Sequence, residues 1–471
     1  MMTSVKVEQL RRKHPRFIYH SFAIERSAEA LKLRFHFTIE PDLQFTPETV
    51  IEAADWDRIK ALSPGLLELF VFQLGLVEML SYWKAACSPE LLVQAGSLDA
   101  QQIEWWTDLL LYGMREFFYV NQIDFTTPGF IHITSSALGK HDDKECHAEP
   151  EQSGGEESRL DRDLVLMSGG KDSALSVQLL RELEREFHCL LLNPTPAAEA
   201  ITAQVGDRMP IIVRRTIDPR LLTLNQAGYL NGHTPFSAYL AMLGVTCAVL
   251  FGYRRVIVAN ERSADEGNVE FLGSEVNHQY SKTLRFERAF RWYSQTYLSR
   301  DVEYFSLLRP LYELQIARLF ARYPQYFSAF TSCNRKQKEG SWCKQCSKCL
   351  STFTLLYPFL TAADITRIFG EDLFERTEAI PMMRELLGFA EHKPFECVGT
   401  REEMLVALYL GIQQAKTRDR TLPAVLRHVE VNLVPQHPDL SQRVKSILHA
   451  WSDQHHLPLA YTDLLRKHLE S

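Results

Sequence analysis

A run of small, hydroxyl and charged residues, SGGKDS from Ser168 to Ser173, has the residue types needed to hold a phosphate. The apolar stretch LVLM precedes it and an amphipathic stretch follows, so the sequence predicts a strand, a tight turn and a helix. Gly169 and Gly170 let the backbone approach an anion closely, and the first amides of the helix point unsatisfied N–H groups at it. The two serine hydroxyls can donate hydrogen bonds, Lys171 adds positive charge, and Asp172 can hold a magnesium ion on the phosphates.

The spacing of this run differs from the Walker A loop, in which four residues separate the first glycine from Gly-Lys-Ser/Thr. It resembles the SGGxDS loop of the PP-loop ATP pyrophosphatases, which cleave ATP between the α and β phosphates. The resemblance implies ATP and Mg²⁺ as cofactors, AMP and pyrophosphate as products, and adenylation of a substrate oxygen. A plain glycine turn is the alternative interpretation of the same residues.

Two further polar runs follow this loop along the chain. The apolar run RRVIVAN leads into Asn260, Glu261 and Arg262, where a strand is expected to end, and ligands of open α/β sheets bind at the carboxyl ends of strands. Further on, EVNHQYSK places Asn277 and His278 side by side, and such side chains are costly to bury without partners. Each run alone is compatible with a solvated loop, but together they favour a binding site.

Four cysteines are clustered in SCNRKQKEGSWCKQCSKC. Cys333, Cys343, Cys346 and Cys349 are separated by nine, two and two residues, a spacing from which a closed Cys₄ zinc site can be built. Such a site is structural, because four thiolates leave no coordination position for water. An iron–sulfur cluster and free catalytic or redox thiols are the alternatives. Cys397, in the polar turn HKPFECVGT, is a separate candidate for chemistry.

The composition is that of an ordinary globular protein. The 471 residues are 45% hydrophobic and 24% charged, which excludes a disordered chain, a collagen-like repeat and a disulfide-dense miniprotein. Lys and Arg number 52 against 59 Asp and Glu, a net charge of −7, so neither a nucleic acid nor a membrane is expected as a partner. The clustered cysteines and the absence of an apolar stretch behind the basic N-terminus predict a reducing, cytoplasmic location. The oligomeric state is left open.

One uncharged segment, Thr234 to Tyr253, is long enough to span a membrane. It begins next to a proline and runs directly into the strand-like RRVIVAN. A buried helix followed by its strand explains the same residues, and we expect that structure rather than a membrane span.

The elements that must position these residues alternate after residue 163. Short apolar runs separated by helical stretches predict an α/β fold, with a parallel sheet covered by helices on both faces, as in PP-loop and HUP-like proteins. A helix-rich α+β region is predicted before it and a helical region after it. The expected organisation is an N-terminal α+β domain over 1–138, a polar linker over 139–163, a PP-loop catalytic domain with the Cys₄ cluster over 164–357, and a helical C-terminal region over 358–471.

Taken in order, several of these runs resemble a single family. SGGKDS, NERSADEGN, VNHQYSK, the stretch from Tyr304 to Pro324, SCNR with WCKQCSKC, and HKPFECVG are similar to the ATP-dependent UDP-N-acetylmuramoyl-L-alanyl-L-glutamate epimerases of bacterial peptidoglycan synthesis. The resemblance covers most of the chain from about Leu66 to Gly399. The expected linker and the residues after Gly399 carry no motif of that family.

The resemblance implies inversion of the terminal L-Glu of a small-molecule substrate, UDP-MurNAc-L-Ala-L-Glu, to D-Glu, with ATP and Mg²⁺ required and AMP and pyrophosphate released. Adenylation would remove the negative charge of the α-carboxylate, so that a general base could then remove the α-proton. The expected roles are ATP binding by Ser168–Ser173, Asn260, Glu261 and Arg262, substrate binding by Asn277 and Arg309, acid or base catalysis by His278 and Cys397, and zinc binding by Cys333, Cys343, Cys346 and Cys349.

Other functions fit parts of the sequence. SGGxDS with a downstream C-x₂-C-x₂-C also resembles the 7-cyano-7-deazaguanine synthases and, more loosely, the tRNA-thiolating enzymes. A 7-cyano-7-deazaguanine synthase would predict a shorter chain, and a tRNA-thiolating enzyme would predict an added basic RNA-binding domain. The net negative charge and the long apolar N-terminal region of this chain fit neither class of enzyme. A non-catalytic ATP-sensing scaffold, in which zinc and nucleotide only set the shape, would bind ATP without forming AMP.

Overall fold

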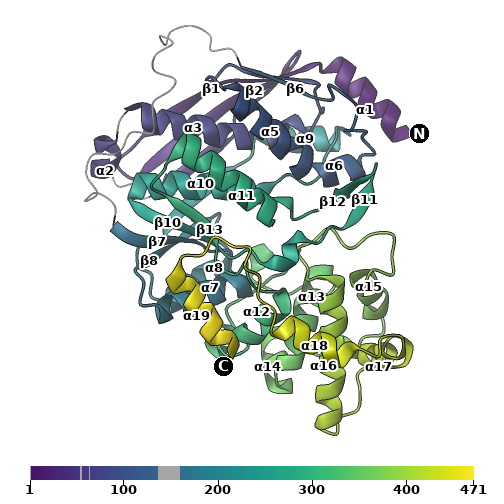
Figure 1. Cartoon of the computed structure of the whole chain (residues 1–471). Coiled ribbons are helices and arrows are strands. Elements are labelled where there is room, and N and C mark those ends of the chain that lie inside the picture. The colour runs from purple at the N-terminus through teal and green to yellow at the C-terminus, as the bar shows by residue number, and fades with distance from the viewer. Residues whose placement is uncertain (1, 53–55, 63, 136–159, 471) are drawn as a thin grey trace.

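A single mixed sheet runs through the molecule. The computed structural model describes residues 2–470 except 53–55, 63 and 136–159. The strand order is β13-β10-β7-β8-β9-β4-β2-β1-β5-β6, with β3 paired to β2 (Figure 1). Strand β9 (Ile211–Thr216) pairs antiparallel with β4 (Glu48–Glu52), so the expected N-terminal and catalytic domains share one continuous sheet.

The parallel part of this sheet carries the apolar runs that the sequence predicted as strands. Besides β9 it contains β7 (Leu160–Leu166), β8 (Phe187–Leu192), β10 (Tyr253–Val258) and β13 (Glu303–Ser306). Neighbours within this part are all parallel, and their order is 3-2-1-4-5 by chain position, that of a doubly wound sheet. The predicted α/β class is confirmed. The winding reverses between β7 and β10, which makes the ends of these strands the expected place for a ligand.

The N-terminal part extends the sheet with a mostly antiparallel arrangement. Its strands are β1 (Arg16–Arg26), β2 (Ala30–Ile39), β3 (Leu43–Phe45), β4, β5 (Glu90–Val93) and β6 (His132–Ser135). Strands β1, β2 and β4 are antiparallel neighbours, whereas β5 and β6 run parallel to β1. The helices of this part are α1 (Met2–Lys13), α2 (Trp56–Ala61), α3 (Pro64–Glu78), α4 (Leu80–Trp83), α5 (Ala100–Gly113) and α6 (Arg115–Val120).

The parallel strands separate two hydrophobic cores, because successive side chains of a strand point to opposite faces of the sheet. Leu164 and Val256 belong to the core that contains helices α3 and α10 (Phe236–Phe251). Val165 and Ile257 belong to the core that contains α7 (Lys171–Glu182) and α12 (Glu313–Phe320). Helices therefore cover both faces, as the sequence predicted.

Helix α10 lies within the uncharged segment that resembled a membrane span. All of its residues from 241 to 251 are buried, and β10 follows it directly, so the prediction of a buried helix with its strand is confirmed. A second helical stretch, Gly65–Trp83, is long and apolar enough to cross a membrane by length and composition. Of its most apolar window, 72% is buried inside the molecule.

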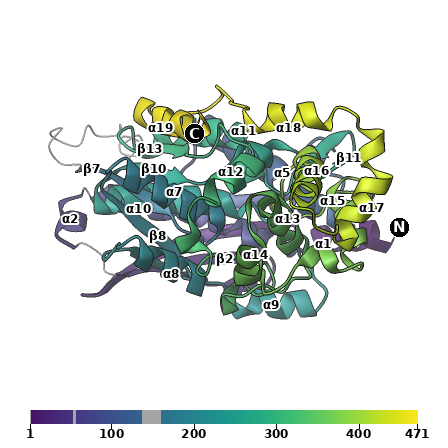
Figure 2. The same cartoon turned by 90° about the horizontal axis from the view of Figure 1, so that it is seen from below.

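The chain after the parallel sheet is largely helical, as expected. Its helices are α13 (Ser347–Leu356), α14 (Ala362–Phe369), α15 (Ala379–Leu386), α16 (Arg401–Thr417), α17 (Ala424–Asn432), α18 (Leu440–Leu448) and α19 (Leu459–Glu470). The last helix returns to the sheet and lies beside β13, where the rings of Tyr461 and Phe305 are 5.2 Å apart (Figure 2). The Tyr461 hydroxyl donates a hydrogen bond of 2.5 Å to Asp163, a fully buried carboxylate of β7.

The expected polar linker overlaps the first strand of the parallel part. Residues 160–163 belong to β7, and Asp163 is buried there because the guanidinium of Arg255 and the Tyr461 hydroxyl both bind it. Residues 139–159 of the expected linker lie outside the described residues.

Candidate functional site

Three loops that carry polar residues converge where the winding of the sheet reverses. Strand β7 leads into Ser168–Ser173, and its neighbour β10 leads into the run that contains Glu261. Helix α12 begins at Glu313, after β13, the next strand across the sheet. Because parallel strands end at the same edge, the predicted phosphate loop and the predicted polar run meet.

The loop Ser168–Ser173, which we call the phosphate-type loop, forms a compact turn at the start of helix α7. Gly169 has a φ of +85°, and a Cβ at this position would lie 2.6 Å from the backbone nitrogen of Ala198, so only glycine fits here. The Oγ atoms of Ser168 and Ser173 are 3.2 Å apart, and Ser173 donates a hydrogen bond of 3.0 Å to the carbonyl of Gly170. The turn therefore brings two hydroxyls and the first amides of α7 to the switch point.

Three carboxylates and a lysine lie directly behind this loop. Oxygen atoms of Asp172, Glu261 and Glu313 are all within 4.8 Å of one another. The ammonium of Lys171 forms ion pairs with Asp172 and Glu313, and its side chain is 2% exposed. Carboxylate oxygens are the ligands that Mg²⁺ prefers, so this carboxylate cluster can hold a divalent cation.

Burial and mutual repulsion change the acidity of this cluster. Burial raises the pKa of Glu261 to about 8, and the neighbouring charge of Glu313 acts in the same direction. Burial would lower the pKa of Lys171, but Asp172 and Glu313 hold it above its ordinary value. A cation bound between the carboxylates would relieve the repulsion that raises the pKa of Glu261.

A second group of reactive side chains surrounds Cys397, in the loop between α15 and α16. The ammonium of Lys282 lies 3.2 Å from its Sγ. Burial by itself raises a thiol pKa, but the charge of Lys282 and a hydrogen bond from His278 lower the pKa of Cys397 to about 5. Burial dominates at Cys87, where the pKa is raised to about 12. Of the described cysteines outside the four-cysteine cluster, Cys397 is the one that is not buried.

His278 links this thiol to a carboxylate of helix α6. Its Nδ1 lies 2.5 Å from Oε2 of Glu116. Burial would lower the pKa of His278, but its interactions with Cys397 and Glu116 raise that pKa to about 9. The ring of His233 lies 4.3 Å from that of His278, and burial together with the charge of His278 lowers the pKa of His233 to about 3. At neutral pH the group thus contains a thiolate, an imidazolium and a neutral imidazole.

Two lysines connect the thiol to the carboxylate cluster. Lys282 interacts electrostatically with Cys397, Glu261 and Asp172. The ammonium of Lys348 donates to the backbone carbonyl of Cys397, and its charge also acts on Asp172. The predicted catalytic residues His278 and Cys397 therefore lie together, within electrostatic reach of the phosphate-type loop.

The side chains of Asn260 and Asn277 bind groups of the protein itself. Asn260 donates a hydrogen bond of 3.2 Å to the hydroxyl of Ser306. Asn277 donates one of 2.9 Å to the carbonyl of Ala264 and accepts one of 2.7 Å from the backbone N–H of Gln279. Both side chains therefore fix the loops that surround the site.

The two predicted arginines lie next to the carboxylate cluster but differ in exposure. Arg309 is buried, and its guanidinium donates to the backbone carbonyls of Glu261 and Lys282. Arg309 therefore connects the loop of Glu261 to the loop of Lys282. Arg262 is partly exposed, and its guanidinium lies 4.5 Å from the centre of the Tyr312 ring.

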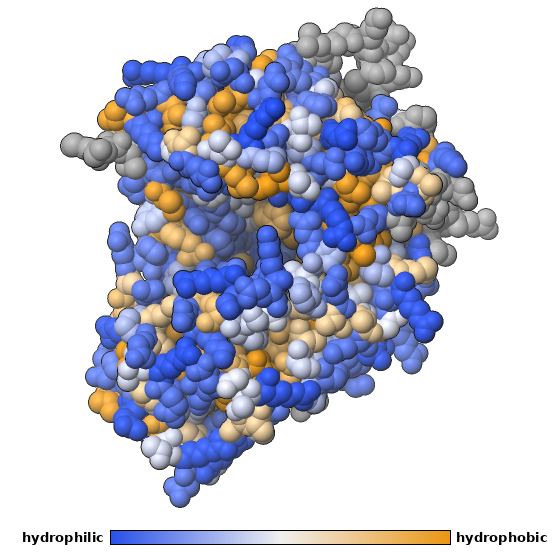
Figure 3. All heavy atoms as spheres, turned by 180° about the vertical axis from the view of Figure 1, so that it is seen from behind, coloured by the Kyte–Doolittle hydropathy of each residue, from blue (hydrophilic) through white to orange (hydrophobic). Residues whose placement is uncertain are grey.

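A cavity of about 410 Å³ opens beside these arginines. Its walls are formed by Arg262, Asp265, Leu284, Arg309 and the segment 451–454. The C-terminal region, in which the sequence showed no motif, therefore forms part of the surroundings of the site. On the face of the molecule that is seen from behind, the surface is hollowed midway between the upper and lower parts (Figure 3).

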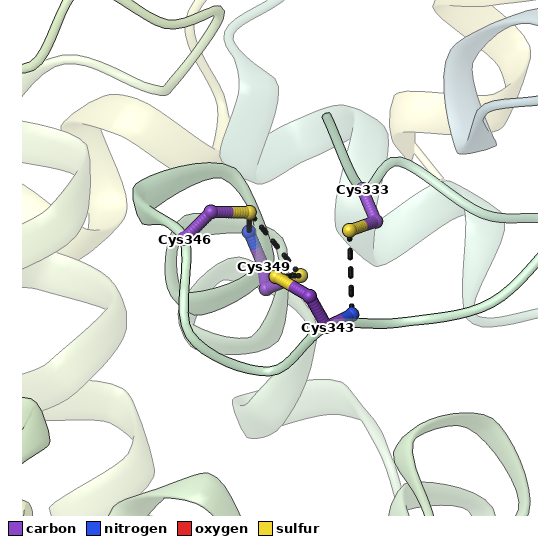
Figure 4. A group of neighbouring side chains, drawn as sticks. All are labelled: Cys333, Cys343, Cys346 and Cys349. Carbon is purple, nitrogen blue, oxygen red and sulfur yellow. Dashed lines mark hydrogen bonds between the residues drawn. The ribbon is translucent and has the colours of Figure 1, made fainter. Parts of the chain in front are cut away.

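The four clustered cysteines converge on one point, as their spacing predicted (Figure 4). All four are free, and their sulfurs lie within 4.8 Å of one another. Sγ of Cys349 is 3.4 Å from that of Cys346 and 3.8 Å from that of Cys343. A tetrahedral zinc ion with bonds of about 2.3 Å separates its sulfur ligands by about 3.8 Å. The cluster therefore has dimensions suited to one metal ion.

Sequence reasoning missed several residues of this site. Glu313, Lys282, Lys348 and Glu116 contact or face the predicted residues, yet they lie in different parts of the chain. Glu313 carried one usable signal, since it is an acidic residue at the first position of a helix whose other residues are mostly apolar. Lys282 is the last residue of the run VNHQYSK, and nothing in that run indicates what its side chain would contact.

The sheet order defines a doubly wound α/β protein with a buried polar cluster at the carboxyl ends of its parallel strands, where ligands of this class of sheet bind. Within that class the chain belongs to the MurL family. Residues 8–307 match the MurL N-terminal domain, and residues 329–442 match the MurL C-terminal domain. The family expected from the sequence motifs is therefore confirmed.

Three relatives carry the name UDP-N-acetyl-alpha-D-muramoyl-L-alanyl-L-glutamate epimerase. The protein from a Micromonospora species is 34% identical over 473 residues, which covers 97% of this chain and 99% of the relative. The protein from Salinispora tropica is 36% identical over 77% of this chain and 76% of its own length. The protein from Xanthomonas oryzae pv. oryzae is 32% identical over 83% of this chain and 84% of its own length.

Proposed function

We propose that this chain is an epimerase that inverts the terminal L-Glu of UDP-MurNAc-L-Ala-L-Glu to D-Glu in bacterial peptidoglycan synthesis. The observation that carries the proposal is the similarity, over almost the whole of both chains, to a relative with that epimerase name. The acidified thiol of Cys397 and the neighbouring His278 support it, because inversion at a carbon needs groups that exchange protons or bind the acyl carbon near neutral pH.

The reaction is coupled to ATP, which solves a problem of acidity. Removing the α-proton of a free carboxylate places a second negative charge next to the first. Transfer of AMP to the carboxylate removes the first charge and makes the carbonyl a better acceptor of the carbanion's electrons. A base then removes the proton, reprotonation from the opposite face gives the D configuration, and hydrolysis makes the cycle irreversible.

The PP-loop type of ATP site fits the residues at the switch point. Ser168–Ser173 would bind the pyrophosphate portion through hydroxyls and the amides of α7. Asp172, Glu261 and Glu313 would hold Mg²⁺, which supplies positive charge to the phosphates. Arg262 is the partly exposed cation beside the cavity and would face the anionic ligand. Arg309 and Asn277 would act on the substrate through the loops that they hold in place.

The four cysteines would hold a structural zinc ion. Their sulfur separations fit a tetrahedral ion, and all four ligands would come from the protein, which leaves no position for a reacting water. The zinc ion would connect the loop at Cys333 to the start of helix α13.

The test incubates the protein with ATP, Mg²⁺ and UDP-MurNAc-L-Ala-L-Glu in deuterated water. We expect deuterium at the glutamate Cα, a D product, and AMP and pyrophosphate in amounts that follow the inversion. The Asp172→Asn variant should keep its fold and lower AMP formation by about 100-fold or more, because it removes one of the carboxylates that would hold Mg²⁺ on the phosphates. AMP formation by the unaltered protein without exchange at Cα would refute the proposal.

A further inference from the structure

Cys397 and His278 act on each other's ionisation, so they are poorly placed to be the two opposed groups of a simple inversion. A two-base inversion needs one group on each side of the α-carbon, several ångströms apart. Here the imidazole lowers the pKa of the thiol, and Glu116 holds Nδ1 of the imidazole at 2.5 Å. Such an arrangement, in which a carboxylate orients an imidazole and the imidazole faces a thiolate, is that of an activated nucleophile.

The position of the thiol supports the same role. The residue is partly exposed, whereas the described core thiols Cys87, Cys189 and Cys247 are buried. The ammonium of Lys282, 3.2 Å from Sγ, also interacts with Glu261 and Asp172 of the carboxylate cluster. The same ammonium therefore acts on the thiolate and on the carboxylates beside the loop at which an acyl group would be activated.

We propose that Cys397 attacks the acyl-adenylate and carries the glutamyl group as a thioester, from whose α-carbon a base takes the proton before an acid returns one from the opposite face. The proposal rests on the proposed function, because the adenylate must form first. The thiolate sulfur forms a bond to the acyl carbon, the bond from that carbon to the phosphate oxygen breaks, and AMP leaves with the electron pair. Water later attacks the thioester carbonyl, which returns the free carboxylate and the thiol. No oxidant or reductant is needed.

A thioester suits the inversion chemically. Sulfur donates less electron density to a carbonyl than oxygen does, so the α-proton of a thioester is more acidic than that of an oxygen ester. Covalent attachment also keeps the activated substrate in place after AMP has left. Glu116 is then a positioning residue, which orients His278 toward the thiolate.

The groups that face the thiol set the charge state in which it acts. They are the ammonium of Lys282 and the imidazole of His278, together with the ammonium of Lys348 on the backbone carbonyl of Cys397. Three positive charges around one sulfur favour the thiolate, which is the nucleophilic form.

The experiment mixes excess enzyme with Mg²⁺, ATP and substrate labelled with ¹⁴C in its glutamyl residue, and stops the reaction with acid throughout the first turnover. We expect label on the precipitated protein that rises with AMP release and falls as the D product appears. Neutral hydroxylamine should release this label, and peptide mass spectrometry should locate it on Cys397. The Cys247→Ala variant, which removes a core thiol, should label like the unaltered protein.

The Cys397→Ala variant separates a nucleophile from an acid or base. A nucleophile predicts that this variant still exchanges pyrophosphate into ATP but loses AMP release and inversion together, each by at least about 100-fold. If the variant releases AMP at the normal rate while the glutamate stays L, Cys397 moves protons only and the thioester is refuted. If the unaltered protein forms neither AMP nor D-Glu, the proposed function itself fails.

Discussion

At the scale of single residues, Lys282 and Glu313 join the parts of the candidate site. The loop at Ser168–Ser173 could be predicted because its strand, glycines and helix are contiguous in the sequence. Its partner Glu313 lies 142 residues beyond Lys171, and no local pattern says that the two side chains meet. His278 and Cys397 were predicted as chemical candidates, but the pKa of each depends on the other and on Lys282.

The pH dependence of the reaction should report this thiol and imidazole. The pKa of Cys397 is lowered to about 5 and that of His278 is raised to about 9, so the rate should fall below the first value, where the thiolate is protonated, and above the second. Because the two groups interact, the acidic and alkaline limbs of the pH profile give apparent pKa values of the Cys397–His278 pair and not of either residue alone. Values of kcat/KM measured from pH 4 to pH 10 check this expectation, because the pH dependence of kcat/KM reports the ionisation of the free enzyme.

Removing the charge of Lys282 should move the acidic limb of the pH profile. In Lys282→Met the pKa of Cys397 rises, so the acidic limb should shift to higher pH and activity near neutral pH should fall but recover partly in alkali. Lys282→Arg keeps the charge and should keep the limb near its original position. An acidic limb that is unchanged in the methionine variant would contradict a role of this lysine in thiol ionisation.

At the scale of elements, the four-cysteine cluster is joined to the loop that carries Cys397 by the first turn of helix α13. Cys346 caps that helix, and Lys348 follows two residues later. The backbone N–H of Lys348 donates to the carboxylate of Glu396, and its ammonium donates to the carbonyl of Cys397. The spacing of the cysteines predicted a metal site, but it could not predict that the site would support a loop nearly 50 residues further on.

Loss of the metal should therefore reduce catalysis as well as stability. In Cys343→Ser we expect loss of most bound zinc, a lower melting temperature and at least a tenfold lower inversion rate, because the start of α13 is no longer held. Elemental analysis, thermal unfolding and the inversion assay measure the three effects. Cys189→Ala, a thiol in the core, should keep its zinc. A serine variant with full activity and no zinc would contradict the coupling.

At the scale of the whole molecule, the continuous sheet joins the N-terminal part to the parallel part. Several strands, such as β7 and β10, could be predicted from their apolar runs, whereas the pairing of β4 with β9 could not, because it joins segments about 160 residues apart. The same holds for α19, whose amphipathic sequence did not indicate that Tyr461 would reach the buried Asp163 of β7.

This contact should contribute measurably to stability. Tyr461→Phe removes the donor to Oδ2 of the buried Asp163, which keeps only the guanidinium of Arg255 on Oδ1, so the free energy of unfolding should fall by about 1–3 kcal/mol. Asp463→Asn, at an exposed position of the same helix, should change it by less than about 0.5 kcal/mol. Urea denaturation of the three proteins measures both values, and equal stabilities would show that α19 is not anchored through this bond.

The bond between Tyr461 and Asp163 also bears on how the protein is made in the cell. The two residues are 298 positions apart. At about 5–20 residues per second, a ribosome needs about 15–60 s to add that length of chain. Of the two partners of the buried carboxylate, Arg255 is made early in this interval and Tyr461 only at its end. All strands of the sheet are made by residue 306, so α19 docks onto a sheet whose strands already exist, and the buried carboxylate of β7 gains its second partner only when translation is nearly complete.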